Sequence, residues 1–364
     1  MSYDATELME QYPFIDYIIS GEGEKAFGAF GSGLEYEKIS GQSWRKDGEI
    51  ISNLQCTPIL DLDSLMPAYE KGELEGLQGK LIYYETSRGC PYGCSYCLSS
   101  IEKGLRHFSM ERVKQDLLLF MECKVPLVKF VDRTFNADAK RCAEILRFIL
   151  AHNQNSCFHF EIAADILTDE IMVLLESAPQ DTFQIEAGVQ STNLEKNIKR
   201  LLQNAKVHIH LDLIAGLPYE DYFSFKQSFN QVFALSPHAL QLGFLKLLKG
   251  TAIRKCAKKH GYKFDPLPPY EVLSNHYISF NELLTLKDIE DVLEKYYNSG
   301  VFEKSCAYVA AQFDSAFDFF ASFAIYLKRI NSEYKPMGMQ ELYKQLYDFY
   351  IVTLGNNFVF FELL

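Results

Sequence analysis

The sequence predicts an α/β chain built around a parallel sheet of six strands. Runs rich in β-branched and aromatic residues recur with helical segments between them, and these runs cover residues 80–88, 127–135, 157–166, 182–190, 207–215 and 240–247. Strands that alternate with helices pair in parallel, in a sheet that is either open or closed into a barrel. After residue 250 the pattern becomes helical and rich in tyrosine and phenylalanine. A helical region is therefore expected to follow the sheet.

Length and composition are those of an ordinary globular protein. With 364 residues, 48% of them hydrophobic, the chain can bury a full core and divide into two or three domains. Its formal net charge of −12 gives no electrostatic footprint for nucleic acid or an anionic membrane, so neither is expected as a partner. The acidic N-terminus lacks the basic and apolar regions of a signal peptide. A cytoplasmic location is therefore expected.

The two ends of the chain differ from its centre, and we predict domains at 1–78, 79–250 and 251–364. Residues 14–20 are strand-like, 21–27 open a possible helix, and 44–51 hold an Asp47-Gly48 turn between two extended pieces. That is too little for an independent α/β domain. The most apolar stretch, 307–327, is interrupted by Gln312, Asp314 and Asp318. We interpret this stretch as a buried amphipathic helix.

Polar side chains alternate with apolar ones on three of the predicted strands. Since successive side chains of a strand point to opposite faces, one common face carries His159, Glu161, Ala163, Gln184, Glu186, Gly188, Gln190, His208, His210 and Asp212. A barrel without a ligand usually fills its lumen with branched apolar residues. These strands therefore predict a lumen that binds something polar, and an open sheet with one wet face is the alternative.

Three of the nine cysteines lie in one loop directly after the first predicted strand. Cys90, Cys94 and Cys97 have the spacing Cys-x3-Cys-x2-Cys, and Gly89 and Gly93 allow the backbone to wrap around an inorganic core. Three thiolates ligate three irons of a [4Fe-4S] cube and leave the fourth iron without a protein ligand, whereas a purely electron-carrying cluster normally has four cysteines. The loop therefore predicts a cluster with one iron open to a ligand.

A zinc site is the alternative reading of these cysteines. Structural zinc takes four ligands, so His107 or Cys123 would have to supply the fourth. The remaining cysteines are scattered and are expected to be reduced, small buried hydrophobes; they are Cys56, Cys123, Cys142, Cys157, Cys256 and Cys306.

The cysteine loop resembles that of the radical S-adenosylmethionine (SAM) superfamily, and Tyr96 before the third cysteine matches its pattern. The resemblance implies a partial (β/α)6 radical SAM barrel that holds a [4Fe-4S] cluster and SAM. It also implies reductive cleavage of SAM to a 5′-deoxyadenosyl radical, with an electron donor such as flavodoxin or ferredoxin. In the coproporphyrinogen-dehydrogenase-like branch, the positions that match Glu161, Gln190 and Asp212 contact SAM. Thr134 matches by position only, and Gly216 would allow close approach of the adenine.

Two features depart from that branch. An arginine about twelve residues after the Gln190 position commonly pairs with the methionine carboxylate, but here only residues 191–206 separate the two strands, so Arg200 or Lys199 would have to substitute. Residues 14–27 resemble the last strand and helix of a cobalamin-binding domain, yet its cobalt-ligating Asp-x-His-x-x-Gly motif is absent. The resemblance is thus to cobalamin-domain radical SAM proteins with a C-terminal helical domain of unknown function, truncated at the front. Cobalamin itself is not expected.

The sequence therefore predicts a radical SAM enzyme that acts on a small or medium-sized organic substrate. A relative of the cobalamin-dependent radical methyltransferases and a non-catalytic, cluster-binding relic are the alternatives. A tRNA methylthiotransferase would need three further cysteines before the barrel, where the chain has only Cys56. Lys246, Tyr270 and His276 are conceivable substrate contacts in the C-terminal part.

Overall fold

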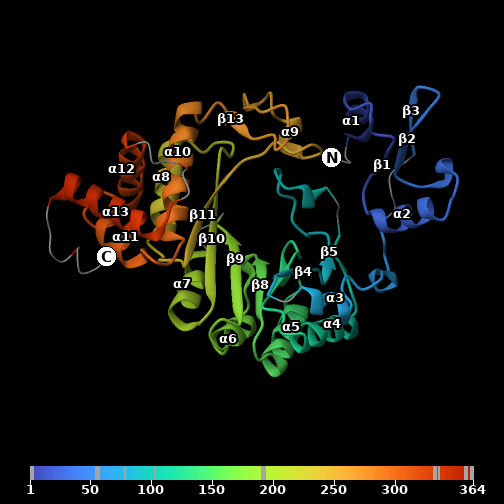
Figure 1. Cartoon of the computed structure of the whole chain (residues 1–364), viewed down its shortest axis with the longest axis horizontal. Helices are drawn as coiled ribbons and strands as arrows, with labels where there is room; N and C mark the ends of the chain where they lie inside the picture. The colour runs from blue at the N-terminus through green and yellow to red at the C-terminus, as the bar shows by residue number, and fades with distance from the viewer. Residues whose placement is uncertain are drawn as a thin grey trace.

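A sheet of six parallel strands forms the centre of the computed structural model, which describes residues 4–53, 58–77, 79–101, 104–189, 194–330, 334, 337–355 and 360. The strand order is β11-β10-β9-β8-β7-β4 (Figure 1). The strands are β4 (Ile82–Tyr84), β7 (Leu127–Phe130), β8 (Cys157–Ile162), β9 (Phe183–Gly188), β10 (His208–Ala215) and β11 (Ala239–Phe244). All neighbours pair in parallel. The predicted six-stranded parallel sheet is therefore confirmed.

Helices connect each strand to the next. They are α4 (Met110–Glu122), α5 (Ala139–His152), α6 (Asp169–Glu176), α7 (Leu194–Asn204) and α8 (Tyr222–Phe233). The strand order follows the chain order, and parallel crossovers are right-handed in nearly all proteins, so these helices are expected on one face of the sheet. Figure 1 shows α4 to α7 side by side below the strands. The opposite face lines the lumen of a partial barrel.

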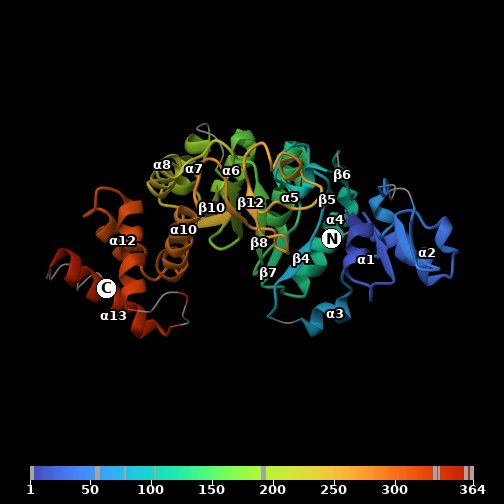
Figure 2. The same cartoon turned by 90° about the horizontal axis from the view of Figure 1, so that it is seen from above.

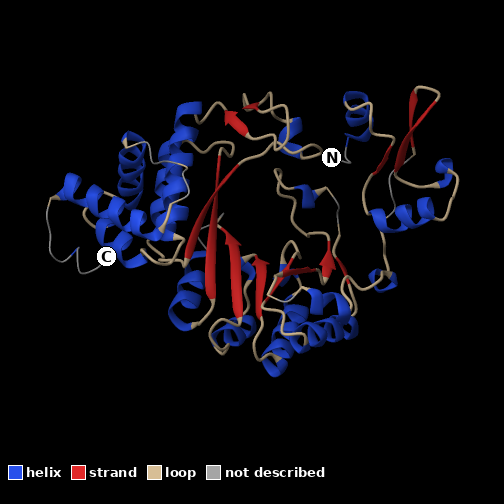
Figure 3. Cartoon of the chain, in the orientation of Figure 1, coloured by secondary structure: helices blue, strands red, loops and turns tan. Residues whose placement is uncertain are grey.

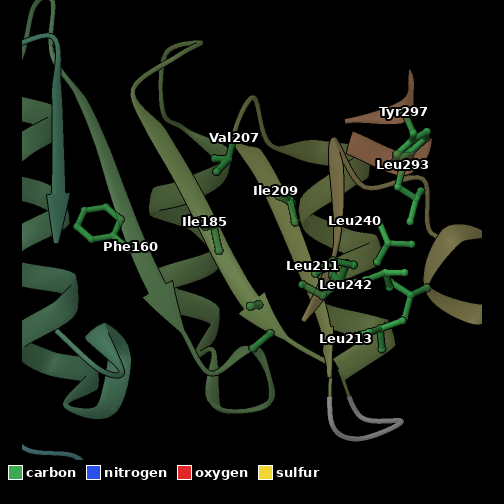
Figure 4. Close-up of a cluster of buried hydrophobic side chains, with 14 of the residues drawn as sticks. Phe160, Ile185, Val207, Ile209, Leu211, Leu213, Leu240, Leu242, Leu293 and Tyr297 are labelled. Carbon is green, nitrogen blue, oxygen red and sulfur yellow. The ribbon is translucent and has the colours of Figure 1, made fainter. Parts of the chain in front are cut away.

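The helix-facing side of the sheet is the apolar core. Phe160, Ile185 and Ile209 lie on neighbouring strands and are at most 1% exposed, and Figure 4 shows their side chains between the ribbons of the sheet and the helices. At the far edge, Leu240 of β11 lies near Leu293 of the π-helix η7 (Leu293–Tyr297) (Figure 4). Burying a side chain of this size contributes about 1.5–3 kcal/mol. The apolar face thereby sets which side of each strand is left for the lumen.

The N-terminal region is a small antiparallel sheet with two helices. Its elements are α1 (Ala5–Gln11), β1 (Tyr17–Ile19), α2 (Gly23–Gly31), η2 (Tyr36–Lys38), β2 (Gln42–Lys46) and β3 (Glu49–Ser52). Asp47 and Gly48 both have positive φ, as a two-residue hairpin turn requires, so the predicted turn is confirmed. The connection to the barrel contains η3 (Leu62–Ser64) and α3 (Lys71–Gly76). Arg106 ties this region to the barrel through Glu22, 2.5 Å away.

The C-terminal region is mostly helical. Its elements are α9 (Ala252–Lys255), β12 (Lys263–Phe264), β13 (Val272–Ser274), α10 (Phe280–Val292), η7, α11 (Glu303–Ala310), α12 (Ala316–Arg329) and α13 (Met339–Leu354). Figure 3 shows α9 and the short β12–β13 pair above the ends of the sheet strands. Seen from above, α12 and α13 lie at the opposite end of the molecule from α1 and α2 (Figure 2). The domain boundaries at 78 and 250 stay a prediction.

The interpretation of 307–327 as a single helix was wrong. The stretch forms the end of α11 and most of α12, separated by a short connection. Ser315 is the reason, because its hydroxyl caps α12 by accepting from the Asp318 N–H. In the described part of the chain, no helix is both long and apolar enough to cross a membrane.

Candidate active site

A short ladder closes the base of the cysteine loop. β5 (Ser87–Arg88) pairs antiparallel with β6 (Arg106–His107), so the loop that starts at Gly89 returns to its origin. Gly89 has a φ of +93°, and a Cβ on it would lie 1.9 Å from the carbonyl oxygen of Gly104. The expected need for glycine at Gly89 is therefore confirmed. At Gly93, in contrast, a Cβ would meet nothing within 4 Å and φ is not positive, so this position does not demand glycine.

The three thiols of the loop are free, half-buried and close enough to influence one another. Burial, and then the nearby thiolates of Cys97 and Cys90, raise the pKa of the Cys94 thiol, while a hydrogen bond from Tyr96 lowers it. The hydroxyl of Thr134, from the loop after β7, lies 3.6 Å from the Cys90 sulfur. Negative charge gathered on three sulfurs is what a cationic iron core relieves. The residues present therefore fit a cluster with three protein ligands.

The zinc alternative finds no ligand set among the described residues. In that part of the chain no three His, Cys, Asp or Glu side chains lie close enough to hold a single metal ion, and this includes the three thiols of the loop. The prediction for the scattered cysteines is confirmed for Cys142 and Cys306, which are buried, and wrong for Cys256, which is exposed. All eight described cysteines are free thiols. Cys56 lies outside the described residues.

Asp132 connects the cysteine loop to the loop after β7. Its carboxylate accepts hydrogen bonds from the backbone N–H of Thr86 (2.8 Å), the Thr86 hydroxyl (2.7 Å) and the Ser87 hydroxyl (2.5 Å). The side chain of Asp132 is 1% exposed, and burial raises its pKa. Arg141 donates to the Thr86 carbonyl from the same side. Asp132 therefore holds in place the chain segment that leads into Gly89.

Sequence reasoning matched Thr134 of this loop by position and gave Asp132 no role. The available signal was a carboxylate directly after a strongly apolar strand, where parallel strands present functional groups.

The lumen face is polar, as predicted. The register aligns its side chains in rows across the sheet: Lys129, His159, Gln184 and His208 in one row, Glu161, Glu186 and His210 in the next, and Gly188 and Asp212 in the third. The carboxylate of Glu186 lies 3.0 Å from His159 Nε2 and 3.4 Å from Lys129 Nζ. His159 first and then Lys129 hold the pKa of Glu186 well below its usual range. The lumen therefore contains a hydrogen-bonded ionic network and not a packed apolar core.

One carboxylate oxygen of Asp212 is buried without a hydrogen-bond partner. Its Oδ1 is buried and finds no hydrogen-bond partner in the described part of the chain. An unsatisfied buried oxygen costs about 1–3 kcal/mol, and a hydroxyl donor of a bound nucleoside would satisfy it. Burial, and then the neighbouring Glu186, raise the pKa of Asp212, and burial likewise raises that of Glu161. These two carboxyl groups fit a bound ligand rich in hydroxyl groups.

Asp212→Asn is expected to stabilise the ligand-free protein. Because the folded-state pKa of Asp212 is raised, the folded chain binds its proton more tightly than the unfolded chain. Stability is then lost as pH rises from the unfolded pKa through the folded one. The asparagine variant lacks this loss, so its urea midpoint should exceed the wild-type value more at pH 8 than at pH 5. Equal differences at both pH values, or the same behaviour in the exposed control Asp314→Asn, would contradict this reading.

Residues of the C-terminal region form hydrogen bonds with the backbone of Gly216. Its φ is +92°, and its carbonyl accepts hydrogen bonds from the Tyr262 hydroxyl (2.9 Å) and the Asn275 amide (3.0 Å). A Cβ on Gly216 would lie 3.6 Å from Leu245 and 3.7 Å from Val272. These are ordinary contact distances, so the positive φ accounts for this glycine, and its contact with adenine stays a prediction.

The two basic substitutes proposed for the missing arginine do not reach the lumen. Arg200 forms ion pairs with Glu176 (2.6 Å) and Asp169 (2.9 Å), both at the ends of α6 on the outer side of the sheet. That expectation was wrong because α7 turns this side chain toward its neighbouring helix. Lys199 is exposed on the same helix. Gln190 lies outside the described residues.

Local packing accounts for the three conceivable substrate contacts of the C-terminal part. Lys246 is exposed, and its backbone forms an isolated antiparallel β-bridge with Glu271. The ring of Tyr270 lies 4.7 Å from the Arg254 guanidinium, and the His276 ring covers Gly261.

Sequence comparisons relate this chain to one family model and to several known proteins. Residues 258–364 match a family model described as a protein of unknown function (DUF4080). An uncharacterised methyltransferase of Pyrococcus horikoshii is 34% identical over 152 residues, 38% of this chain and 32% of that protein. The 2-(S-pantetheinyl)-carbapenam-3-carboxylate methyltransferase of Streptantibioticus cattleyicolor is 24% identical over 72% of this chain and 44% of its own length. The anaerobic magnesium-protoporphyrin IX monomethyl ester cyclase of Synechocystis is 28% identical over 61% and 46%. The chain thus spans less than half the length of these relatives.

Two solved structures share the fold. The radical SAM methyltransferase TsrM from Kitasatospora setae, solved with its tryptophan substrate and a SAM analogue, has a TM-score of 0.58 and 16% identity over 74% of this chain and 60% of its own. The cobalamin-dependent SAM radical enzyme OxsB has a TM-score of 0.59 and 17% identity over 97% of this chain and 62% of its own. The second match extends over the N-terminal and C-terminal regions as well as the sheet.

Proposed function

We propose that this chain, a member of the radical SAM superfamily, binds a [4Fe-4S] cluster through Cys90, Cys94 and Cys97 and uses it to cleave SAM reductively. The resulting 5′-deoxyadenosyl radical would abstract hydrogen from a small or medium-sized organic substrate. The observation that carries the proposal is the set of three free thiols in one loop whose base is closed by the β5–β6 ladder, with the Cys90 sulfur 3.6 Å from the Thr134 hydroxyl.

In this proposal the three cysteines bind the cluster, and the carboxyl groups of the lumen orient SAM. When bound, the cluster supplies the electron that breaks a carbon–sulfur bond of SAM. Cys90, Cys94 and Cys97 would hold its irons, while Asp212 and Glu161 accept hydrogen bonds from the hydroxyl groups of the nucleoside. Val272 of β13 packs beside Gly216, which follows the strand that carries Asp212.

A cobalamin-dependent radical methyltransferase is the second candidate function. It is supported by the names of the relatives, which include the cobalamin-dependent radical SAM methyltransferase TokK of Streptomyces tokunonensis, 25% identical over 63% of this chain and 39% of its own length. Against it stands the absence of an Asp-x-His-x-x-Gly motif from the sequence. A chain of this sequence would need another ligand for cobalt.

Anaerobic reconstitution with iron and sulfide tests the proposal. Reduced with dithionite in the presence of SAM, the protein is expected to release 5′-deoxyadenosine and methionine, and to release neither when SAM or dithionite is left out. A protein that forms the cluster but yields no 5′-deoxyadenosine would be the non-catalytic relic. Stoichiometric binding of zinc without any uptake of iron would overturn the cluster proposal itself.

A further inference from the structure

A basic segment of the chain adjoins the cysteine loop. Residues 246–263 contain seven lysines and arginines and no aspartate or glutamate, although the whole chain has 48 acidic and only 36 basic side chains. The segment includes α9, which Figure 1 shows above the ends of the sheet strands. The backbone N–H of Ile253 in α9 donates to the carbonyl of Ser95 (2.9 Å), and Ser95 lies between Cys94 and Cys97. Positive charge is therefore concentrated beside the loop that would hold the cluster.

α9 and the turn that follows it have a buried side and an exposed side. Ile253 and His260 are buried, whereas the exposed side carries Lys255, Lys258 and Lys259. Residues three and four positions apart lie on the same face of a helical turn, so these three side chains are neighbours. At a rise of about 1.5 Å per residue, all three lie within about 10 Å of Ile253 along the axis. We call these three lysines the basic surface.

The charge of the basic surface is not neutralised by the protein. Among the described residues, none of its three lysines forms an ion pair, and all three are exposed. Other basic groups of the segment are engaged: Lys249 is buried and pairs with Glu7 (2.9 Å), and the guanidinium of Arg254 lies 4.7 Å from the centre of the Tyr270 ring. Three neighbouring positive charges in an acidic protein form a local field that attracts a negatively charged partner.

The proposed reaction needs such a partner, because its electron comes from outside the chain. One electron breaks one carbon–sulfur bond of SAM and gives methionine and the 5′-deoxyadenosyl radical, so a donor is oxidised by one electron for each SAM cleaved. A donor protein has to bring its redox group close to the cysteine loop and leave again. Encounters of this kind use small interfaces, and complementary charge steers them and sets their rate.

We propose that the basic surface is the docking site of an acidic one-electron carrier protein that reduces the cluster. The proposal rests on the proposed function, because it assumes that a cluster is held by the cysteine loop. A long polyanion such as RNA would also meet the remaining surface of a chain with a net charge of −12, which repels it. A compact acidic protein meets the local positive charge and is therefore the favoured partner.

Binding of two carriers to the reconstituted protein tests the proposal, and the probes are an acidic flavodoxin and an acidic ferredoxin. In calorimetric titrations at low salt, the triple variant Lys255→Glu, Lys258→Glu, Lys259→Glu is expected to bind the preferred carrier about 10- to 100-fold more weakly than the wild type. The difference should shrink at high salt, because exposed charges are screened. The corresponding triple arginine variant keeps the charge and should bind like the wild type.

A second triple variant, Lys124→Glu, Lys206→Glu, Lys304→Glu, is the matched control with the same change in net charge. These lysines are exposed: two precede β7 and β10, at the opposite end of the sheet from the cysteine loop, and the third lies on α11. The control should bind the carrier like the wild type. With dithionite, which needs no docking site, both triple variants should form as much 5′-deoxyadenosine as the wild type.

Four results would overturn the proposal. They are an unchanged carrier affinity in the first triple variant, equal losses in both triple variants, a wild type that binds neither carrier, and tighter binding of single-stranded RNA than of either carrier that the first variant loses. The last result would make the surface a nucleic-acid site. A wild type that forms no 5′-deoxyadenosine with dithionite would instead mean that the proposed function has failed, whatever the carrier titrations give.

Discussion

Cys94→Ala is expected to abolish the cluster and with it the formation of 5′-deoxyadenosine. Cys94 is the middle thiol of the three, and burial, followed by the neighbouring thiolates of Cys97 and Cys90, raises its pKa. Removing it leaves two protein ligands for a cube that needs three. Reconstituted wild type should hold about four irons per chain, and the variant should hold almost none. Iron and sulfide assays, the visible absorption of the cluster and a chromatographic assay for 5′-deoxyadenosine measure the three effects.

Cys256→Ala is the control for this experiment. Cys256 is an exposed free thiol at the end of α9, a helix that touches the loop where the Ile253 N–H donates to the Ser95 carbonyl (2.9 Å). Its removal tests whether the loss of any thiol near the loop has the same effect. The cluster content of Cys256→Ala should match the wild type. If Cys94→Ala kept its iron and Cys256→Ala lost it, the assignment of ligands would be wrong.

Asp132→Ala is expected to lower the free energy of unfolding by about 2–4 kcal/mol and to reduce cluster uptake as well. The variant leaves three donors, the Thr86 N–H and the hydroxyl groups of Thr86 and Ser87, without their acceptor in a buried place. These residues lead directly into Gly89, so their displacement would also displace the first thiol of the loop. Urea denaturation followed by circular dichroism measures the first effect, and iron content after reconstitution the second.

Asp138→Ala separates loss of stability from loss of loop position. Asp138 caps α5 by accepting from the N–H groups of Lys140 and Arg141, and losing such a cap costs about 1 kcal/mol. It lies six residues after Asp132 on the same connection but, among the described residues, its side chain forms no hydrogen bond or ion pair with the cysteine loop. The Asp138 variant should therefore lose some stability and keep its cluster. If both variants lost iron in proportion to their stability, Asp132 would have no particular role in placing the loop.

Much of the fold could be predicted because it depends on local periodicity. The alternation of Phe160, Ile185 and Ile209 with polar neighbours marked both faces of the sheet, and the structure buries the first set and turns the second into the lumen. The Asp47-Gly48 turn followed from residue types that accept positive φ. The prediction of a single helix over 307–327 was wrong, because it did not treat the interrupting polar residues as a helix boundary. The stretch forms two helices, and Ser315 caps the second.

The site was predicted in part. Its thiols follow from a spacing of eight residues, and its lumen carboxylates from period two along the strands. The partners of Asp132 lie 45 and 46 residues before it in the chain, and no local pattern links them. The same holds for Arg200, whose ion pairs lie 24 and 31 residues away on another helix.

The sequence by itself determined that this protein has a six-stranded parallel sheet with a polar face and a loop of three cysteines at the end of its first strand. The tertiary structure alone decided which residues surround that loop: Asp132 holds the segment that leads into it, and Thr134 lies beside Cys90. The physical reason is the range of the forces involved. Side-chain alternation and turn preference act between residues adjacent in the chain. Hydrogen bonds and charges act across a few ångströms of space, which only the packed sheet brings together.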